Sequence, residues 1–433
     1  MALQPDSTKS KNLGVPELIA IALGGMVGGG IFSILGISVA MIGPYTLIAI
    51  ILGGLFAALA AYSYVKLGVY YQDEGASYSF FKRTFPNSRF AASLIGWWVI
   101  FGYISTIALY AYTFSSYALS GFSGMHSELT RQLIASAIIL LFAFINIWSV
   151  KGMGKLEDLM VYSKLIILVV ISFVLINNSS TSLPVLLEEH GQTNLLAVLT
   201  VASLTFVAYE GFQLVINAVN ETDNPDKNIP KAIYSAIGLA ILIYVIIALG
   251  AILAIPFEDI IANQEYALAT GADKTLGHWG TDLVILGAVL ATCSAISGTL
   301  FGASRQMAVI AKEGYFPAIL STRKYNIPVY SIISMAGLAI VLIFAGDLQV
   351  ILEFGSVTFL LVSVLMAYAN FRIREKTQSS AVMAWLAIVG LLIGLILILY
   401  FEWRTQPEQL IFIGGIFFIL TISAWGYSKR VFR

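Results

Sequence analysis

Twelve long apolar segments constrain the fold of this chain more than any other feature of its sequence. Each has roughly 20 to 30 residues and few charges, which is the length an α-helix needs to cross a bilayer. Transmembrane β-strands are much shorter, so a barrel is excluded. The predicted spans are residues 15–41, 44–66, 91–120, 130–150, 157–177, 195–219, 231–256, 279–311, 328–346, 349–371, 381–401 and 408–427. We therefore expect an all-α integral membrane protein with twelve transmembrane helices.

The composition supports this class and excludes several others. Charged residues make up 11% of the chain and hydrophobic residues 58%, whereas a soluble domain has about 25% charged residues. The net charge is zero, so a nucleic-acid partner has no basic surface to bind. Cys293 is the only cysteine, and the three histidines, His126, His190 and His278, lie far apart. We expect no metal site and no cofactor.

The distribution of basic residues predicts the orientation. Twenty of the 24 lysines and arginines fall in the tails and in the loops on the same side as the tails. Only Arg131, Lys274 and Arg404 fall in the loops of the other side. Basic residues concentrate on the cytoplasmic side, so we expect a multi-pass protein of the cell membrane with both termini in the cytoplasm. The remaining basic residue, Lys164, falls inside a span.

Glycines interrupt the first span. Residues 24–36 read GGMVGGGIFSILG and contain six glycines, with Gly28, Gly29 and Gly30 consecutive. Each glycine costs roughly 1 kcal/mol relative to alanine inside a helix. Close packing against other helices is one interpretation, but packing favours glycines four residues apart on one face. Three consecutive glycines point around the whole helix, which favours an unwound segment at mid-membrane.

The sixth span has a matching irregularity. Glu210 and Gly211 lie in FVAYEGFQ, near the middle of an apolar run. A carboxyl group at that depth is costly and usually faces a site or a cavity, although a protonated glutamate hydrogen-bonded within the bundle is the alternative. Spans one and six are five apart. Interrupted helices at matching places in two five-span halves indicate an inverted-repeat transporter, whose half-helices offer N–H groups to anions and carbonyls to cations.

Lys164 lies about two turns into the fifth span, within VYSKLII. A lysine at this depth can extend its amine toward the cytoplasmic surface. The functional alternatives are an amine in a dry pocket that exchanges a proton, or a fixed positive charge that replaces a bound cation.

Several motifs together resemble the amino acid–polyamine–organocation superfamily. Gly28-Gly29-Gly30-Ile31-Phe32 is similar to the G-x-G-I/V-F signature of its first span. The run Phe206–Ile233 is similar to its sixth span and the following Asn-Pro…Pro-x-Ala loop. Three shorter motifs also match, namely Tyr103…Ile107-Ala108-Leu109, Gly302-Ala303-Ser304-Arg305 and Gly314-Tyr315-Phe316-Pro317. Within the superfamily the chain most resembles the archaeal proton-coupled, sodium-independent amino acid transporters.

The resemblance implies a leucine-transporter-like fold with a five-plus-five inverted repeat and with helices 1 and 6 broken. The first repeat would be residues 15–177 and the second 195–371. Spans eleven and twelve, in 381–427, would lie outside the repeats and are candidates for a homodimer contact. The remaining segments, 1–14 and 428–433, would be cytoplasmic tails.

The resemblance also implies a site. Backbone N–H groups of Gly28, Gly29 and Gly30 would bind the substrate carboxylate, and carbonyls of span six would bind its ammonium group. The implied substrate-binding residues are Gly28, Gly29, Gly30, Ile31, Tyr103, Phe206, Val207, Ala208, Tyr209, Glu210 and Gly211. The implied proton-coupling residue is Lys164, with Gly24, Val27, Cys293 and Ser294 around it. Glu210 is a second proton-coupling candidate because of its depth in span six, and pairing with a cationic group of the substrate is its alternative role.

The expected function is secondary active import of amino acids by alternating access, as a proton-coupled, sodium-independent symporter. A polyamine or amine permease, or an exchanger of the same fold, is the alternative. The archaeal relatives have an apolar residue where this chain has Glu210, and arginine–agmatine exchangers have a glutamate where it has Gln213. An enzyme is not expected, because no nucleophile–base pair or metal cluster is present. A channel would need a repeated filter sequence.

Overall fold

Long apolar helices dominate the computed structural model, which describes residues 13–73, 75–120, 127–148, 150–179, 181–190, 193–263, 266–324 and 327–430. These residues form no β-sheet, only two isolated bridges. In chain order the α-helices (α) and 3₁₀ helices (η) are α1 Val15–Met26, α2 Gly29–Ile42, η1 Gly43–Tyr45, α3 Thr46–Tyr71, α4 Ala76–Thr84, α5 Arg89–Leu119, α6 Glu128–Trp148, α7 Val150–Asn177, α8 Leu183–His190, α9 Leu195–Thr205, η2 Phe206–Tyr209, α10 Leu214–Asn217, η3 Val219–Glu221, α11 Pro225–Ala254, α12 Phe257–Ala262, α13 Ala267–Leu276, α14 His278–Lys312, η4 Ala318–Ser321, α15 Val329–Ala345, α16 Leu348–Arg372, α17 Ala381–Thr405 and α18 Pro407–Arg430.

The all-α membrane class is confirmed. Among the described residues, ten helical runs are long and apolar enough to cross a membrane, the run from α2 through α3 counting as one. Two shorter apolar helices, α1 and α15, fall below that length. Alone, the 12 residues of α1 reach only about 18 Å. The count of twelve spans therefore stays a prediction.

Four short helices between the long ones, α4, α8, α12 and α13, were not expected. They are too short and too polar to stand out as apolar runs. Two ion pairs anchor the last turn of α4, with Lys82 2.6 Å from Glu313 and Arg83 paired with Asp73. The Tyr78 hydroxyl also donates to Glu313, and burial together with this carboxylate raises the pKa of Tyr78 above its usual range.

The structure describes the two predicted tails to different extents. Residues 1–12 lie outside the described part of the chain, so most of the tail expected over 1–14 is untested. At the other end, α18 continues to Arg430, so the helix includes the first three residues of the tail expected over 428–433.

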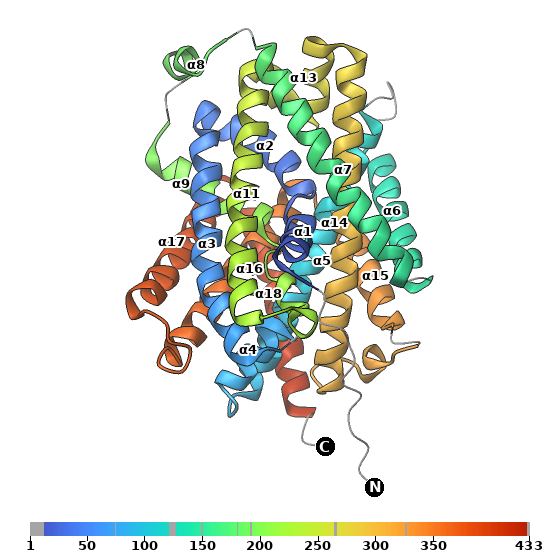
Figure 1. Cartoon of the computed structure of the whole chain (residues 1–433), viewed down its shortest axis with the longest axis vertical. Helices are drawn as coiled ribbons and strands as arrows, with labels where there is room; N and C mark the ends of the chain where they lie inside the picture. Colours follow the sequence, from blue (N-terminus) through green and yellow to red (C-terminus); the bar gives the residue numbers. More distant parts are fainter. Residues whose placement is uncertain are drawn as a thin grey trace.

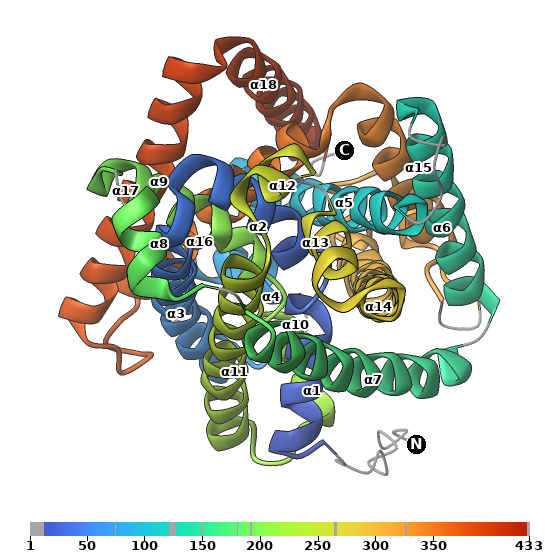
Figure 2. The same cartoon turned by 90° about the horizontal axis from the view of Figure 1, so that it is seen from above.

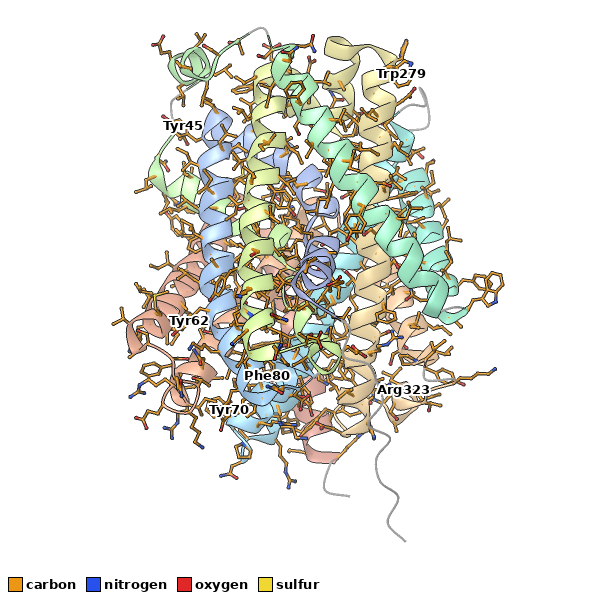
Figure 3. The ribbon with its side chains drawn as sticks, viewed as in Figure 1. Tyr45, Tyr62, Tyr70, Phe80, Trp279 and Arg323 are labelled. Atoms are coloured by element: carbon orange, nitrogen blue, oxygen red, sulfur yellow. The ribbon has the colours of Figure 1, made fainter. Side chains whose placement is uncertain are left out.

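The long helices run roughly side by side in one bundle (Figure 1). α5 and α16 lie in the interior of the bundle, because 78% and 89% of the residues in their apolar 18-residue stretches are buried. The corresponding share for α18 is 17%. Figure 2 shows α17 and α18 at the edge of the bundle. Figure 3 places Tyr70, Phe80 and Arg323 toward one end and Tyr45 and Trp279 toward the other.

Two irregular segments meet inside the bundle. The first is the last turn of α1 together with the gap between α1 and α2, and the second follows α9, where η2 and a short turn precede α10. They touch through two glycines. A Cβ on Gly211 would lie 2.6 Å from the Gly25 carbonyl carbon and 2.7 Å from the Met26 nitrogen, and Gly211 has a φ of +133°. Only glycine combines this backbone angle with this contact.

Replacing Gly211 should therefore destabilise the fold. We expect Gly211→Ala to cost about 2 kcal/mol or more, because strain at a positive φ alone costs roughly 1–3 kcal/mol and the added methyl group meets backbone. The measurement is the melting temperature of purified protein in detergent. Gly337→Ala is the matched control, since nothing lies within 4 Å of its added Cβ. Equal melting temperatures for both variants would contradict the close contact.

Candidate functional site

The gap between α1 and α2 consists of Val27 and Gly28. The Gly28 N–H donates to the Met26 carbonyl at 2.8 Å, so one of the three glycine donors expected for a carboxylate is used inside the gap. Gly29, Gly30 and Ile31 form the first turn of α2, where N–H groups have no acceptor within their own helix. This end of α2 therefore presents partial positive charge toward the centre of the bundle.

The same glycines also allow close packing. A Cβ on Gly28 would lie 2.6 Å from the Ala295 Cβ of α14, and one on Gly30 would lie 2.9 Å from the Ala208 Cα of η2. The two interpretations of the glycine run are thus compatible. The helix is interrupted here, and its neighbours approach closer than a side chain would permit.

Lys164 of α7 reaches the end of α1. Its Nζ donates to the carbonyls of Val27 at 2.6 Å and Gly24 at 3.1 Å, and to Ser294 Oγ of α14 at 3.2 Å. The side chain is fully buried, so the amine points into the bundle and does not extend to the surface. A cation at this place complements the negative end of the α1 dipole. Of the residues expected around Lys164, Gly24, Val27 and Ser294 bind its amine, whereas Cys293 is not among these partners. The role of Lys164 in coupling stays a prediction.

Two tyrosines bind the remaining carbonyls of this last turn. The Tyr110 hydroxyl of α5 donates to the Gly25 carbonyl at 3.0 Å. The Tyr244 hydroxyl of α11 lies 2.6 Å from the Met26 carbonyl and 2.8 Å from the Ala208 carbonyl. Tyr244 therefore connects the two irregular segments through a single hydroxyl group. Sequence reasoning missed both residues.

Glu210 lies at the second irregular segment, directly after η2, and is buried. Its Oε2 accepts a hydrogen bond from Gln213 Nε2 at 2.5 Å, and the same amide lies 3.2 Å from the Tyr103 hydroxyl. The side-chain amide oxygen of Gln213, Oε1, accepts a hydrogen bond from the Gly211 N–H at 3.3 Å. Gln213 thus holds Glu210 and Tyr103 together, so the carboxyl group faces a polar cluster and not the packed core.

A small cavity borders this cluster. Its volume is about 10 Å³, room for about one water molecule. The lining residues come from α1, α5, α10, α14, α16 and the second irregular segment: Gly25, Tyr103, Thr106, Tyr110, Glu210, Gly211, Leu214, Thr299 and Phe359. An amino acid is several times larger than water, so binding here requires side chains to move. Phe359, whose ring packs edge-on to Tyr103 at 5.4 Å between centroids, is well placed to do so.

Only some of the predicted substrate-binding residues line the cavity. Tyr103, Glu210 and Gly211 line it, whereas Phe206 and Tyr209 do not. The Tyr209 hydroxyl instead donates to the Ile50 carbonyl of α3 at 2.8 Å. Val207 accepts the Glu210 N–H and Ala208 accepts Tyr244, so both carbonyls are engaged within the bundle.

The residues that sequence reasoning missed carried a partial signal. Thr106 and Tyr110 follow Tyr103 by three and seven residues, which places all three on one face of α5. Thr299 and Phe359 lie on α14 and α16, and their distance in sequence from the glycine motifs gives no such signal.

The chain is similar in sequence to several known proteins. The chain is 28% identical to the inner membrane transport protein YbaT of Escherichia coli, covering 96% of each chain. It is 25% identical to an uncharacterised protein of Methanocaldococcus jannaschii, covering 94% of this chain and 93% of the relative. It is also 25% identical to the branched-chain amino acid permease BcaP of Bacillus subtilis, covering 74% and 71%.

The family comparison covers nearly the whole chain. Residues 13–425 match the amino acid permease family, which includes the apolar helices, both irregular segments and the cavity. Members of this family are transporters and not enzymes. The chain therefore belongs to the amino acid permease family of the amino acid–polyamine–organocation superfamily and is a multi-pass membrane transporter.

Proposed function

We propose that this protein imports amino acids by alternating access, driven by protons and independent of sodium. One observation carries the proposal: the buried amine of Lys164 binds two carbonyls at the end of α1 and Ser294 of α14. Because the positively charged amine already binds these oxygens, it takes the place that a sodium ion would otherwise occupy. The same amine is able to change its charge by exchanging a proton.

The fold we propose for this function has twelve transmembrane helices in a five-plus-five inverted repeat. In it, α1 and α2 form the first interrupted span, and α9 to α10 form the sixth. The two irregular segments lie in contact at Gly25 and Gly211, as expected where two interrupted helices share a site at the repeat interface.

The N-terminus of α2 supports an amino acid substrate. Its first-turn N–H groups favour an anionic group such as a carboxylate, and a polyamine has none. The buried carboxyl group of Glu210 in the cavity favours the alternative, a polyamine or amine permease or an exchanger, because it offers a partner to a cationic group. An amino acid satisfies both ends at once.

The proposed location is the cell membrane, with both termini in the cytoplasm. The support is the concentration of lysine and arginine in the loops on that side. α17 and α18 lie at the edge of the bundle (Figure 2), and Ile411, Phe418 and Ile419 of α18 are exposed. These helices are the proposed homodimer contact.

The deciding experiment measures uptake into proteoliposomes against a panel of amino acids and amines. We expect amino acids to compete with one another, and amines that lack a carboxylate to compete poorly. Uptake should respond to an imposed pH gradient and should be the same in sodium and choline buffers at constant membrane potential. Sodium-dependent uptake would refute the coupling, and equal competition by amines would favour the polyamine alternative.

Lys164→Ala should separate coupling from binding. Without the amine, uptake should lose its dependence on the pH gradient while part of the substrate binding remains. The fold should lose about 2–3 kcal/mol, since hydrogen bonds to a charged donor are worth roughly 1.5–3 kcal/mol. Ser294→Ala is the control, because it removes one partner and keeps the amine. A pH dependence that survives in Lys164→Ala would show that another group carries the proton.

Glu210→Gln should distinguish pairing with the substrate from proton relay. The amide keeps the shape and the contact with Gln213 but fixes the charge at zero. We expect weaker substrate binding, with the largest loss for cationic amino acids, because the carboxyl group borders the cavity. Binding is measured by isothermal titration or by ligand-induced thermal stabilisation. Full binding with failed proton-driven accumulation would instead identify a relay.

Tyr244→Phe should loosen the connection between the two irregular segments. It removes a hydroxyl that contacts carbonyls on both of them, at a cost of about 1–3 kcal/mol in the free energy of unfolding. Initial uptake rates should fall as well. Tyr209→Phe is the matched control, because that hydroxyl binds a carbonyl of α3 only. If both variants behave alike, the bridging position of Tyr244 has no special role.

A further inference from the structure

A large groove lies outside the proposed transport site, at the end of the bundle where α3 ends and α11 begins. Its volume is about 570 Å³. Three segments form it: the last turns of α3, the first turns of α11, and the connection between α16 and α17. Tyr62 and Tyr70 of α3 lie along it, in the lower part of the view in Figure 3.

The rim of the groove is fixed by hydrogen bonds. Lys66 Nζ donates to the Gln378 carbonyl at 3.0 Å, and the Ser380 N–H donates to the Tyr62 hydroxyl at 2.7 Å. On the other side, Gln72 Nε2 donates to Asp226 Oδ1 at 3.0 Å. These bonds connect the α16–α17 segment to α3 and connect α3 to α11. Hydrogen bonds between all three segments therefore border the groove.

The charge of the groove favours an anion. Two lysines line it, Lys66 and Lys376, against one carboxylate, Asp226, which already accepts a hydrogen bond from Gln72. Tyrosines at positions 62, 70 and 234 add hydroxyl groups beside the lysines. Lysines and tyrosines are the side chains that proteins place at the level of lipid headgroups.

The walls of the groove continue into the surface that faces the acyl chains. On α3, Leu55 lies two turns beyond Tyr62 toward the membrane centre, and Ile51 and Ile48 follow at intervals of about one turn; these three residues are exposed and apolar. Their spacing of three, four and seven residues keeps them on one face. The groove and this apolar stripe form one continuous amphipathic track.

The neighbouring helix provides the second wall. α11 packs against α3, and its residues Pro230 and Tyr234 line the groove. Gly238 and Leu242 follow at intervals of four. Leu242 is exposed, and no atom lies within 4 Å of a Cβ added to Gly238. The track beside α3 is therefore open at Gly238.

We propose that this groove binds one anionic phospholipid. The phosphate headgroup contacts Lys66 and Lys376, and the acyl chains lie along the exposed faces of α3 and α11. A soluble phosphate would use the lysines but not the track, whereas a lipid uses both. The proposal concerns a separate site, so it stands or falls independently of the transport mechanism.

The test is lipid binding to the purified full chain in detergent, measured by native mass spectrometry during titration with phosphatidylglycerol or phosphatidylcholine. We expect one tightly retained phosphatidylglycerol. The double variant Lys66→Gln/Lys376→Gln should bind it about 30-fold more weakly, at about 1 kcal/mol for each lysine near a lipid headgroup. Lys429→Gln/Arg430→Gln, the same charge change at the end of α18, should bind it normally.

A second variant tests the track without changing charge. Gly238→Leu fills the open space on α11 and should also weaken phosphatidylglycerol binding, while its melting temperature stays at the wild-type value. This variant also keeps the proposal testable if the double lysine variant does not fold. Soluble glycerol 3-phosphate should fail to displace the lipid. Equal retention of phosphatidylcholine, displacement by glycerol 3-phosphate, or unchanged binding in Gly238→Leu would overturn the proposal.

Discussion

The packing of the bundle depends on the last turn of α1, whose carbonyls need hydrogen-bond donors from the surrounding helices. A helix that ends inside a bilayer leaves its final carbonyls without partners, and no bulk water is there to satisfy them. Here side chains from three other helices supply the donors: Lys164 from α7, Tyr110 from α5 and Tyr244 from α11. The interruption is therefore stable only because the helices around it are packed in this arrangement.

These side chains differ in how many hydrogen bonds they can donate. A tyrosine hydroxyl donates one proton, so Tyr244 cannot fully satisfy the Met26 and Ala208 carbonyls together. A lysine amine donates three when charged, and Lys164 uses them on two carbonyls and one serine hydroxyl. Of these three side chains, Lys164 donates to two carbonyls of the α1 end and Tyr110 and Tyr244 to one each. A charged amine binds these carbonyls more strongly than a neutral one.

The sequence predicts the long elements well and the contacts between them poorly. Apolar runs give the positions of the long helices because each helix needs a fixed length of hydrocarbon-compatible residues. Consecutive glycines mark the interruption at Gly28, since they remove both helix propensity and side-chain bulk. Tyr244 could not be found this way, because only the folded bundle brings it between two distant carbonyls. The short helices α4, α8, α12 and α13 were missed because none of them contains a long apolar run; α4, for example, is held by the ion pairs of Lys82 and Arg83.

A motion that opens the proposed site has to separate α1 from at least one of its donors. If α1 moves away from α7, the carbonyls of Gly24 and Val27 lose the Lys164 amine. Leaving a charged amine and two carbonyls without partners in an apolar interior is costly. A neutral amine binds the carbonyls less strongly and costs less to leave uncovered. In the proton-coupled mechanism that we propose, loss of a proton from Lys164 would favour release of α1 and its return would favour recapture, so that this buried amine would tie proton movement to the opening of the site.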